Sequence, residues 1–145
     1  MSALGPLAAA ALTGWVAALI TADVRHRRLP NVLTLPGALA ILSWALGAGL
    51  AKPAILGALA LSGVYLAVHL VDPAGLGAGD VKLAVALGAL TGAFGLPVWL
   101  IGALGAPLLT AVAGAVAAVR RRGALVPHGP SMCVASLAAV GLAVF

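Results

Sequence analysis

The chain has 145 residues, of which 63% are hydrophobic and 8% are charged, and its formal net charge is +5 at pH 7. Soluble domains average about 45–50% apolar and about 25% charged residues, and a fold of this length exposes too much surface to hide the excess from water. The composition therefore excludes a water-soluble protein, and we expect an all-α polytopic membrane protein with a single domain over residues 1–145.

Six apolar stretches follow one another along the chain and predict six transmembrane helices, since a spanning helix needs roughly 20 mostly apolar residues. The first basic side chain, Arg25, follows the first stretch, so we expect this stretch to be retained as a span and not cleaved as an export signal. Gly95-Leu96-Pro97 predicts the break after the short fourth stretch, because proline removes a hydrogen-bond donor. The predicted helices cover about residues 3–22, 32–50, 54–71, 81–94, 96–119 and 131–145.

Basic residues gather in alternate loops between these helices. The first, third and fifth loops hold seven of them, whereas the opposite side has only Lys52 and the amino terminus. The positive-inside rule therefore predicts a multi-pass protein of the bacterial inner (cell) membrane, with the odd loops in the cytoplasm and both termini outside. Short basic clusters are typical of loops near anionic headgroups, so we expect membrane lipids and not nucleic acid as partners. The seven residues are Arg25, Arg27, Arg28, Lys82, Arg120, Arg121 and Arg122.

The chain has only three acidic residues, Asp23, Asp72 and Asp80, and each lies at the end of a predicted span on the cytoplasmic side. An ionisable group near the hydrocarbon boundary is costly and is therefore a functional candidate. The alternative for Asp23 is that it only balances the arginines that follow it. Asp72 precedes Pro73, which favours a role in ending the third span over a catalytic role.

Three motifs contain or follow these acids and carry a resemblance to a known family. They are Asp23 followed by Leu29-Pro30-Asn31, then Gly77-Ala78-Gly79-Asp80-Val81-Lys82, and then Pro127-His128-Gly129-Pro130. Together they resemble the type IV prepilin peptidase family of GxGD aspartic peptidases, and in particular its short stand-alone members of the tight-adherence or preflagellin type. The resemblance covers the whole chain, in motif order and in number of spans.

The resemblance implies that Asp23 and Asp80 are the catalytic aspartates of a leader peptidase. Its substrates would be pilin-like precursors, in which a short basic leader precedes an apolar helix and the cut falls at their junction, at the cytoplasmic membrane face. This implies a place in type IV pilus, tight-adherence or type II secretion pathways. By the same resemblance the supporting residues are Pro30, Asn31, Gly77, Gly79, Lys82, Gly129 and Pro130.

No cofactor and no metal are expected. Longer members of the family carry an N-terminal segment with two Cys-x-x-Cys pairs that is linked to N-methylation, whereas this chain has the single cysteine Cys133. We therefore expect no zinc site, and the methyltransferase activity does not carry over. His26, His69 and His128 show no metal-ligand spacing, so structural roles are favoured for all three.

Hydrolysis by two carboxyl groups needs one ionised and one protonated, because close carboxylates cannot both ionise cheaply. Packing the first and fourth predicted spans together would bring Asp23 and Asp80 into one site. Asp80, at a helix N-terminus near Lys82, is expected to be the carboxylate, and Asp23, at a helix C-terminus, the protonated acid. Gly77 and Gly79 have no Cβ, so we expect a positive φ or a close approach of another backbone there.

Two other classes of protein compete with a peptidase. A proton-coupled small membrane transporter would have acids near mid-span and two related halves, and a non-catalytic secretion or pilus assembly factor would need neither aspartate. The many small residues fit helix packing in lipid, either within one chain or between two.

Overall fold

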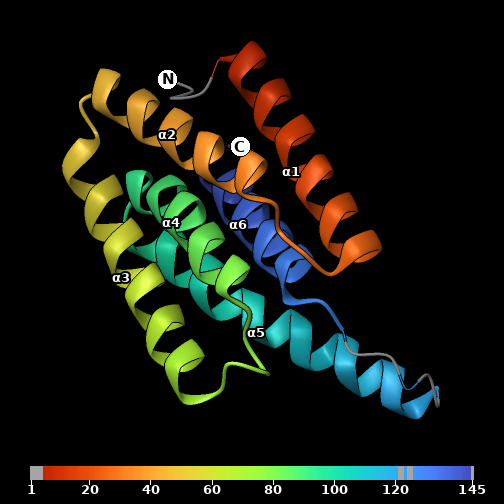
Figure 1. Ribbon diagram of the computed structural model, residues 1–145. Helices are drawn as coiled ribbons and strands as arrows, with labels where there is room; N and C mark the ends of the chain where they lie inside the picture. Colours follow the sequence, from red (N-terminus) through yellow and green to blue (C-terminus); the bar gives the residue numbers. More distant parts are fainter. Residues whose placement is uncertain (1–4, 121–122, 124–125, 145) are drawn as a thin grey trace.

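The computed structural model describes residues 5–120, 123 and 126–144 and contains six α-helices in this part of the chain (Figure 1). The number of helices agrees with the sequence prediction. Three of them, α1, α3 and α5, are long and apolar enough to cross a membrane. The other three have 16 or 17 residues, so a crossing by each of these stays a prediction. The helices are α1 (Pro6–His26), α2 (Asn31–Gly47), α3 (Ala51–Val71), α4 (Ala78–Ala93), α5 (Leu96–Val119) and α6 (His128–Val144).

The predicted break between the fourth and fifth helices is confirmed. Helix α4 ends at Ala93 and α5 begins at Leu96. Gly95 between them has φ +104, a backbone conformation that side chains with a Cβ rarely adopt. Pro97 lies in the first turn of α5, where its missing N–H would have no partner within the helix.

Several predicted boundaries are wrong by about one turn. Helix α2 ends at Gly47 and not at residue 50, α3 begins at Ala51 and not at residue 54, and α4 begins at Ala78 and not at residue 81. Helix α1 continues past residue 22 to His26, because basic side chains are stable in the last turn of a helix. Arg27 ends it with φ 50, and its N–H donates to the Asp23 carbonyl at 2.8 Å. Helix α6 begins at His128 and not at residue 131, because Pro130 is tolerated in a first turn. The predicted helix ends at residues 3 and 145 lie outside the described residues.

Helix α4 lies at the centre of the bundle, in contact with α2, α3, α5 and α6. Its leucines Leu83, Leu87 and Leu90 are buried. Helix α1 packs against α6 and α2 and stands at the edge of the bundle (Figure 1). The central position of α4 brings its first turn, with Asp80, toward the end of α1 and the start of α6.

Small residues let α3 and α4 approach closely. A Cβ on Gly88 would lie 2.9 Å from the Cβ of Leu61, and a Cβ on Gly92 would lie 2.6 Å from the Pro53 carbonyl oxygen. Both distances are shorter than real Cβ atoms allow, so only glycine fits at this contact. The Trp99 indole N–H of α5 also donates to the Gly57 carbonyl of α3, at 3.0 Å. Such close contacts between small residues are how helices pack in lipid.

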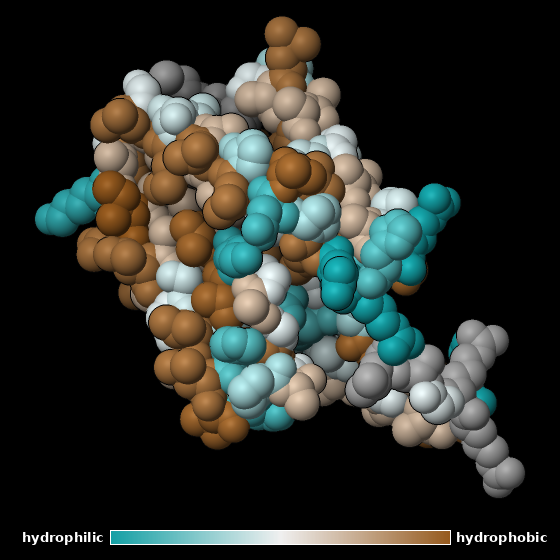
Figure 2. Space-filling model, viewed as in Figure 1, coloured by the Kyte–Doolittle hydropathy of each residue, from teal (hydrophilic) through white to brown (hydrophobic). Residues whose placement is uncertain are grey.

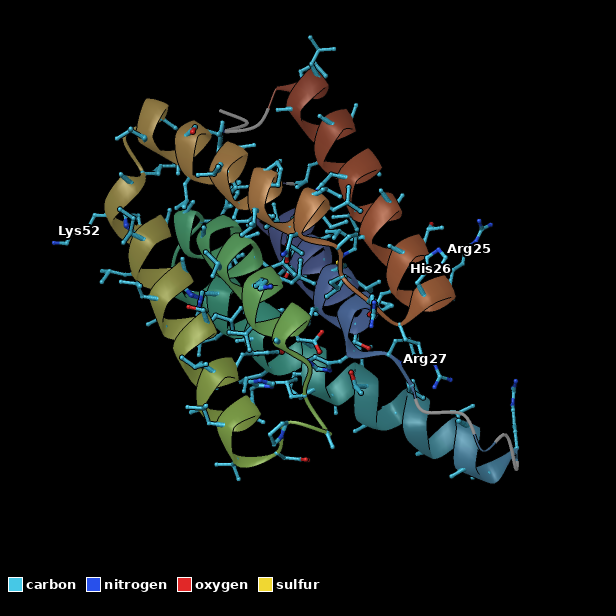
Figure 3. The ribbon with its side chains drawn as sticks, in the orientation of Figure 1. Arg25, His26, Arg27 and Lys52 are labelled. Atoms are coloured by element: carbon cyan, nitrogen blue, oxygen red, sulfur yellow. The ribbon has the colours of Figure 1, made fainter. Side chains whose placement is uncertain are left out.

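The outer surface is apolar, as expected for a protein whose solvent is lipid. Leu39, Leu104 and Leu142 are each more than 60% exposed, and Figure 2 shows hydrophobic side chains over the side of the molecule formed by α3. Figure 3 places Lys52, at the start of α3, far from Arg25 and Arg27 at the end of α1. Lys52, predicted to lie on the opposite side, is therefore separated in space from Arg25 and Arg27.

Candidate active site

Asp23 and Asp80 line the same cavity although they are far apart in the sequence. Asp23 comes from the last turn of α1 and Asp80 from the first turn of α4. The cavity has a volume of about 650 Å³, and a smaller one of about 240 Å³ on the side of α6 is also lined by both residues. The structure thus brings the two predicted catalytic residues together.

Asp80 is held at the start of α4 by the glycine motif. The N–H of Gly77, the residue before the helix, donates to Asp80 Oδ2 at 3.3 Å, and the Asp80 N–H donates back to the Gly77 carbonyl at 3.1 Å. The expected positive φ is wrong, because Gly77 has φ −73 and Gly79 lies within the helix. At Gly79 a Cβ would lie 3.0 Å from the Cβ and 3.6 Å from the backbone nitrogen of Leu29 in the loop after α1. The expected approach of another backbone stays a prediction.

Asp23 is held by the start of α6. Its side chain is only 7% exposed, and its carboxyl accepts a hydrogen bond from the backbone N–H of Gly129. The first N–H groups of a helix have no partner within the helix, so a carboxyl group is a suitable acceptor there. A Cβ on Gly129 would collide with Asp23 Oδ2. The third motif therefore places a glycine against the first aspartate, and Pro130 follows it in the same turn.

The remaining predicted residues lie around the larger cavity. Lys82 Nζ of α4 donates to Asn31 Oδ1, the first residue of α2, at 2.8 Å. Pro30, immediately before Asn31, lines the cavity with both of them, as do two basic residues of the same loop, Arg27 and Arg28. The first and second motifs are thus joined by a hydrogen bond between side chains at this cavity.

Asp72 lies outside both cavities. It stands at the end of α3, and its Oδ1 accepts a hydrogen bond from the Gly75 N–H at 3.0 Å. An aspartate that bonds the backbone three residues on stabilises a turn. The structure therefore places Asp72 as the residue that ends α3, in agreement with the sequence analysis.

Two histidines make contacts next to the aspartate pair that the sequence did not indicate. His128 Nε2 lies 2.7 Å from the Tyr65 hydroxyl, and His128 Nδ1 lies 2.7 Å from Thr110 Oγ1. His69 Nδ1 lies 2.6 Å from the Leu76 carbonyl oxygen. Tyr65 and Thr110 sit within separate apolar helices and belong to no motif, so no signal in one sequence links them to His128.

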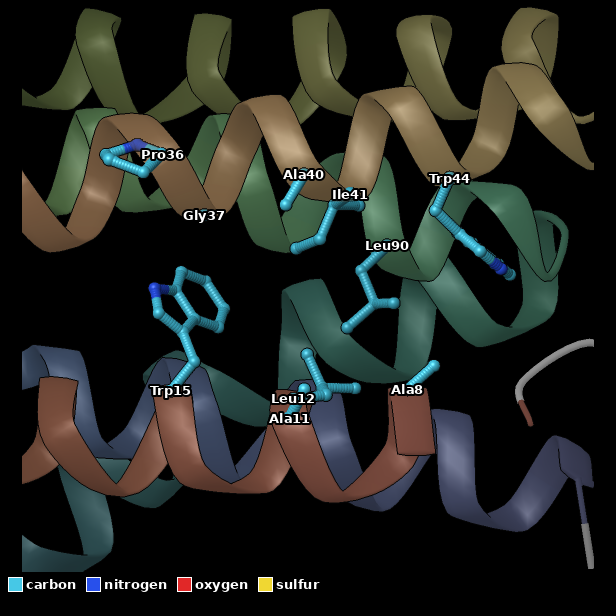
Figure 4. A pocket seen from close by; sticks show the side chains of 10 residues that line it. All are labelled: Ala8, Ala11, Leu12, Trp15, Pro36, Gly37, Ala40, Ile41, Trp44 and Leu90. Atoms are coloured by element: carbon cyan, nitrogen blue, oxygen red, sulfur yellow. The ribbon is translucent and has the colours of Figure 1, made fainter. Parts of the chain in front are cut away.

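An apolar pocket of about 380 Å³ lies between α1 and α2, with Trp15 and Trp44 toward its two ends (Figure 4). The Trp15 indole N–H donates to the Leu33 carbonyl at 2.8 Å and so bridges the two helices. The side chains that line it are apolar and carry no ionisable group. Among the described residues, no group of three or more His, Cys, Asp or Glu side chains could hold a metal ion.

Comparisons with known proteins agree with the motifs. The model of the type IV leader peptidase family matches residues 10–145. A prepilin leader peptidase/N-methyltransferase of Xanthomonas campestris pathovar campestris is 37% identical over 140 residues, which cover 86% of this chain and 46% of the relative. The chain thus spans about half the length of that relative, and no solved structure gives a significant match. Because the family model covers nearly all of the sequence, the chain belongs to the type IV leader peptidase family.

Proposed function

We propose that this chain is an aspartic endopeptidase that removes the leader peptide of type IV pilin-like precursors at the cytoplasmic face of the inner membrane. Asp23 and Asp80 are its catalytic pair. The observation that carries the proposal is that these two carboxyl groups, from different helices, line one cavity at one end of the bundle. Family membership and the relative's name support prepilin processing.

Two carboxyl groups can hydrolyse a peptide bond without any other reacting group. The ionised member takes a proton from a water molecule, whose oxygen forms a bond to the carbonyl carbon, while the protonated member gives its hydrogen to the carbonyl oxygen. The first carboxyl then protonates the amine nitrogen as the C–N bond breaks. The second takes a proton back from a hydroxyl of the intermediate, and the pair returns to its starting state.

The placement of the acids supports a peptidase over a proton-coupled transporter. A transporter that relays protons needs acids near mid-span, whereas each acid here lies at the end of a helix. Asp23 lies in the last turn of α1, Asp72 just after the end of α3, and Asp80 in the first turn of α4. A cut between a basic leader and an apolar helix would fall at the membrane surface. A site at helix ends suits such a substrate.

Which carboxyl is ionised at rest stays a prediction. Each accepts one backbone N–H, from Gly129 for Asp23 and from Gly77 for Asp80, so these hydrogen bonds do not distinguish them. The position of Asp80 at a helix N-terminus favours Asp80 as the carboxylate.

The test is cleavage of a pilin-like precursor by the purified protein in detergent, with Asp23→Asn, Asp80→Asn and Asp72→Asn variants. Wild type and Asp72→Asn should release the leader and leave a shorter product, because Asp72 lies outside both cavities. Neither of the other variants should do so. Full cleavage by Asp23→Asn or Asp80→Asn would rule out the aspartate pair.

A further inference from the structure

His69 of α3 contacts the peptide unit that binds Asp80. A carbonyl oxygen can only accept, so the 2.6 Å contact means that His69 Nδ1–H donates to the Leu76 carbonyl. The Leu76 carbonyl and the Gly77 N–H belong to one planar peptide unit, in which they point in opposite directions. The same Gly77 N–H donates to Asp80 Oδ2. His69 therefore fixes the plane of the peptide whose other side faces the Asp80 carboxyl.

Tyr65, one turn before His69 on α3, contacts the start of α6 through His128. The Thr110 hydroxyl lies 3.1 Å from the Ala106 carbonyl, which can only accept its hydrogen. Thr110 Oγ1 then accepts from His128 Nδ1–H, which leaves His128 Nε2 to accept from the Tyr65 hydroxyl. This arrangement gives every group in the chain of hydrogen bonds a partner. It holds the first residue of α6 from two sides.

The next residue of α6 is Gly129, whose N–H donates to the Asp23 carboxyl. We propose, resting on the function proposed above, that Tyr65 and His69 are positioning residues for the aspartate pair. Tyr65 acts on Asp23 through His128 and the Gly129 N–H. His69 acts on Asp80 through the peptide unit between Leu76 and Gly77.

The two positioning residues lie on the same face of α3. Residues four apart in a helix lie on the same face, and Tyr65 and His69 have this spacing. Tyr65 is buried, with 7% of its side chain exposed, and Leu76 is buried with 8% exposed. Helix α3 is in turn held against α4 by contacts that admit only glycine at Gly88 and Gly92. The bond from His69 to the Leu76 carbonyl and the bond from the Gly77 N–H to Asp80 share one peptide unit, so they polarise one another and strengthen the bond to Asp80.

Infrared spectroscopy of protein labelled with ¹³C-aspartate tests the proposal without substrate. The chain has three acidic side chains, all aspartate, so each carboxyl band can be assigned with one Asp→Asn variant. Tyr65→Phe removes only a hydroxyl and should move the Asp23 band while the Asp80 band stays in place. His69→Leu should move the Asp80 band and leave the Asp23 band unchanged. The Asp72 band should not move in either variant.

Activity on a pilin-like precursor supplies the second measurement. We expect His69→Leu and Tyr65→Phe each to lower kcat about ten- to a hundredfold, because a small displacement of a reacting group has effects of this size, with KM within twofold of wild type. His69→Asn should restore most of the lost kcat, because the amide nitrogen of Asn occupies the place of Nδ1 and can donate to the Leu76 carbonyl.

Two results would overturn the positioning roles. One is that the Asp23 and Asp80 bands stay unchanged in both variants. The other is that His69→Leu moves the Asp72 and Asp80 bands together and His69→Asn does not restore kcat. This would mean that the His69 contact only holds the loop between α3 and α4 in place. Absence of cleavage by wild type would instead count against the proposed function. The infrared bands would still show whether Tyr65 and His69 act on the two aspartates.

Discussion

Asp23 faces a residue that has no side chain, and this contact explains the glycine of the third motif. The Gly129 N–H reaches the Asp23 carboxyl because no Cβ lies between the start of α6 and the end of α1. Any other residue would have to displace the aspartate or the helix. Asp80, by contrast, has room beside Gly77, where an added Cβ would be 3.6 Å from its Oδ2. The two aspartates therefore differ in how strictly their partner must be glycine.

Replacing Gly129 by alanine should abolish most cleavage while the protein still folds. The new Cβ would collide with Asp23 Oδ2 and push the carboxyl away from its partner, so we expect a loss of about a hundredfold in kcat/KM. Gly141→Ala is the matched control, because it makes the same change in the same helix at a position with open space. Wild-type cleavage by Gly129→Ala would contradict the contact.

The hydrogen bond between Lys82 and Asn31 predicts non-additive effects at the cavity. Both side chains are exposed, so Lys82→Met and Asn31→Ala should each change the free energy of unfolding by less than about 1 kcal/mol. Each should lower kcat/KM by about five- to tenfold, and the double variant should be no worse than either single one, because partners in one bond are coupled. A double variant whose losses multiply would show that the two side chains act independently.

At the scale of the helices, the contact between α3 and α4 sets the position of the site. Gly88→Val should lower the free energy of unfolding by about 1–3 kcal/mol, the usual cost of overpacking, because a Cβ there would lie 2.9 Å from Leu61 Cβ and 3.1 Å from the Cα of Ala58. Gly63→Val in α3 is the control, since its position is open. Thermal unfolding in detergent compares the two variants, and equal unfolding midpoints would disprove the close contact between α3 and α4.

Helix boundaries were predictable where a backbone constraint marks them. The bounds of α5 match the prediction because Gly95 and Pro97 can be read directly from the sequence. The end of α1 was missed because hydropathy treats Arg25 and His26 as loop, although both are compatible with a last helical turn. The start of α6 was missed because Pro130 breaks a helix interior but not its first turn.

The candidate site was predictable only where motifs mark it. Asp23 and Asp80 lie in motifs of recognised spacing, and their shared cavity agrees with the prediction. Tyr65 and Thr110 could not be predicted, because polar side chains inside apolar helices reveal no partner until the helices are packed. The positive φ expected for the glycine motif was wrong because Gly77 precedes a helix in an extended conformation, with ψ 153.

At the scale of the whole molecule, the separation of Lys52 from the cluster at the end of α1 predicts the orientation in the membrane. Arg25 and Lys52 are exposed, whereas the single cysteine, Cys133, is fully buried and should not react. With a membrane-impermeant maleimide, Lys52→Cys should be labelled from outside the inner membrane and Arg25→Cys only in inverted vesicles. Labelling of both from the same side would contradict the proposed topology.

The shortness of α4, which α2, α3, α5 and α6 enclose, has a consequence for the surface above its first turn. Sixteen residues make a helix of about 24 Å, which is about 6 Å less than the hydrocarbon thickness of an ordinary bilayer. A buried helix of this length ends below the level of the bilayer surface, and in α4 the polar first turn carries Asp80 and Lys82. We therefore expect water to enter the protein cavity above the aspartates, so that a scissile bond reaches them without leaving the interface.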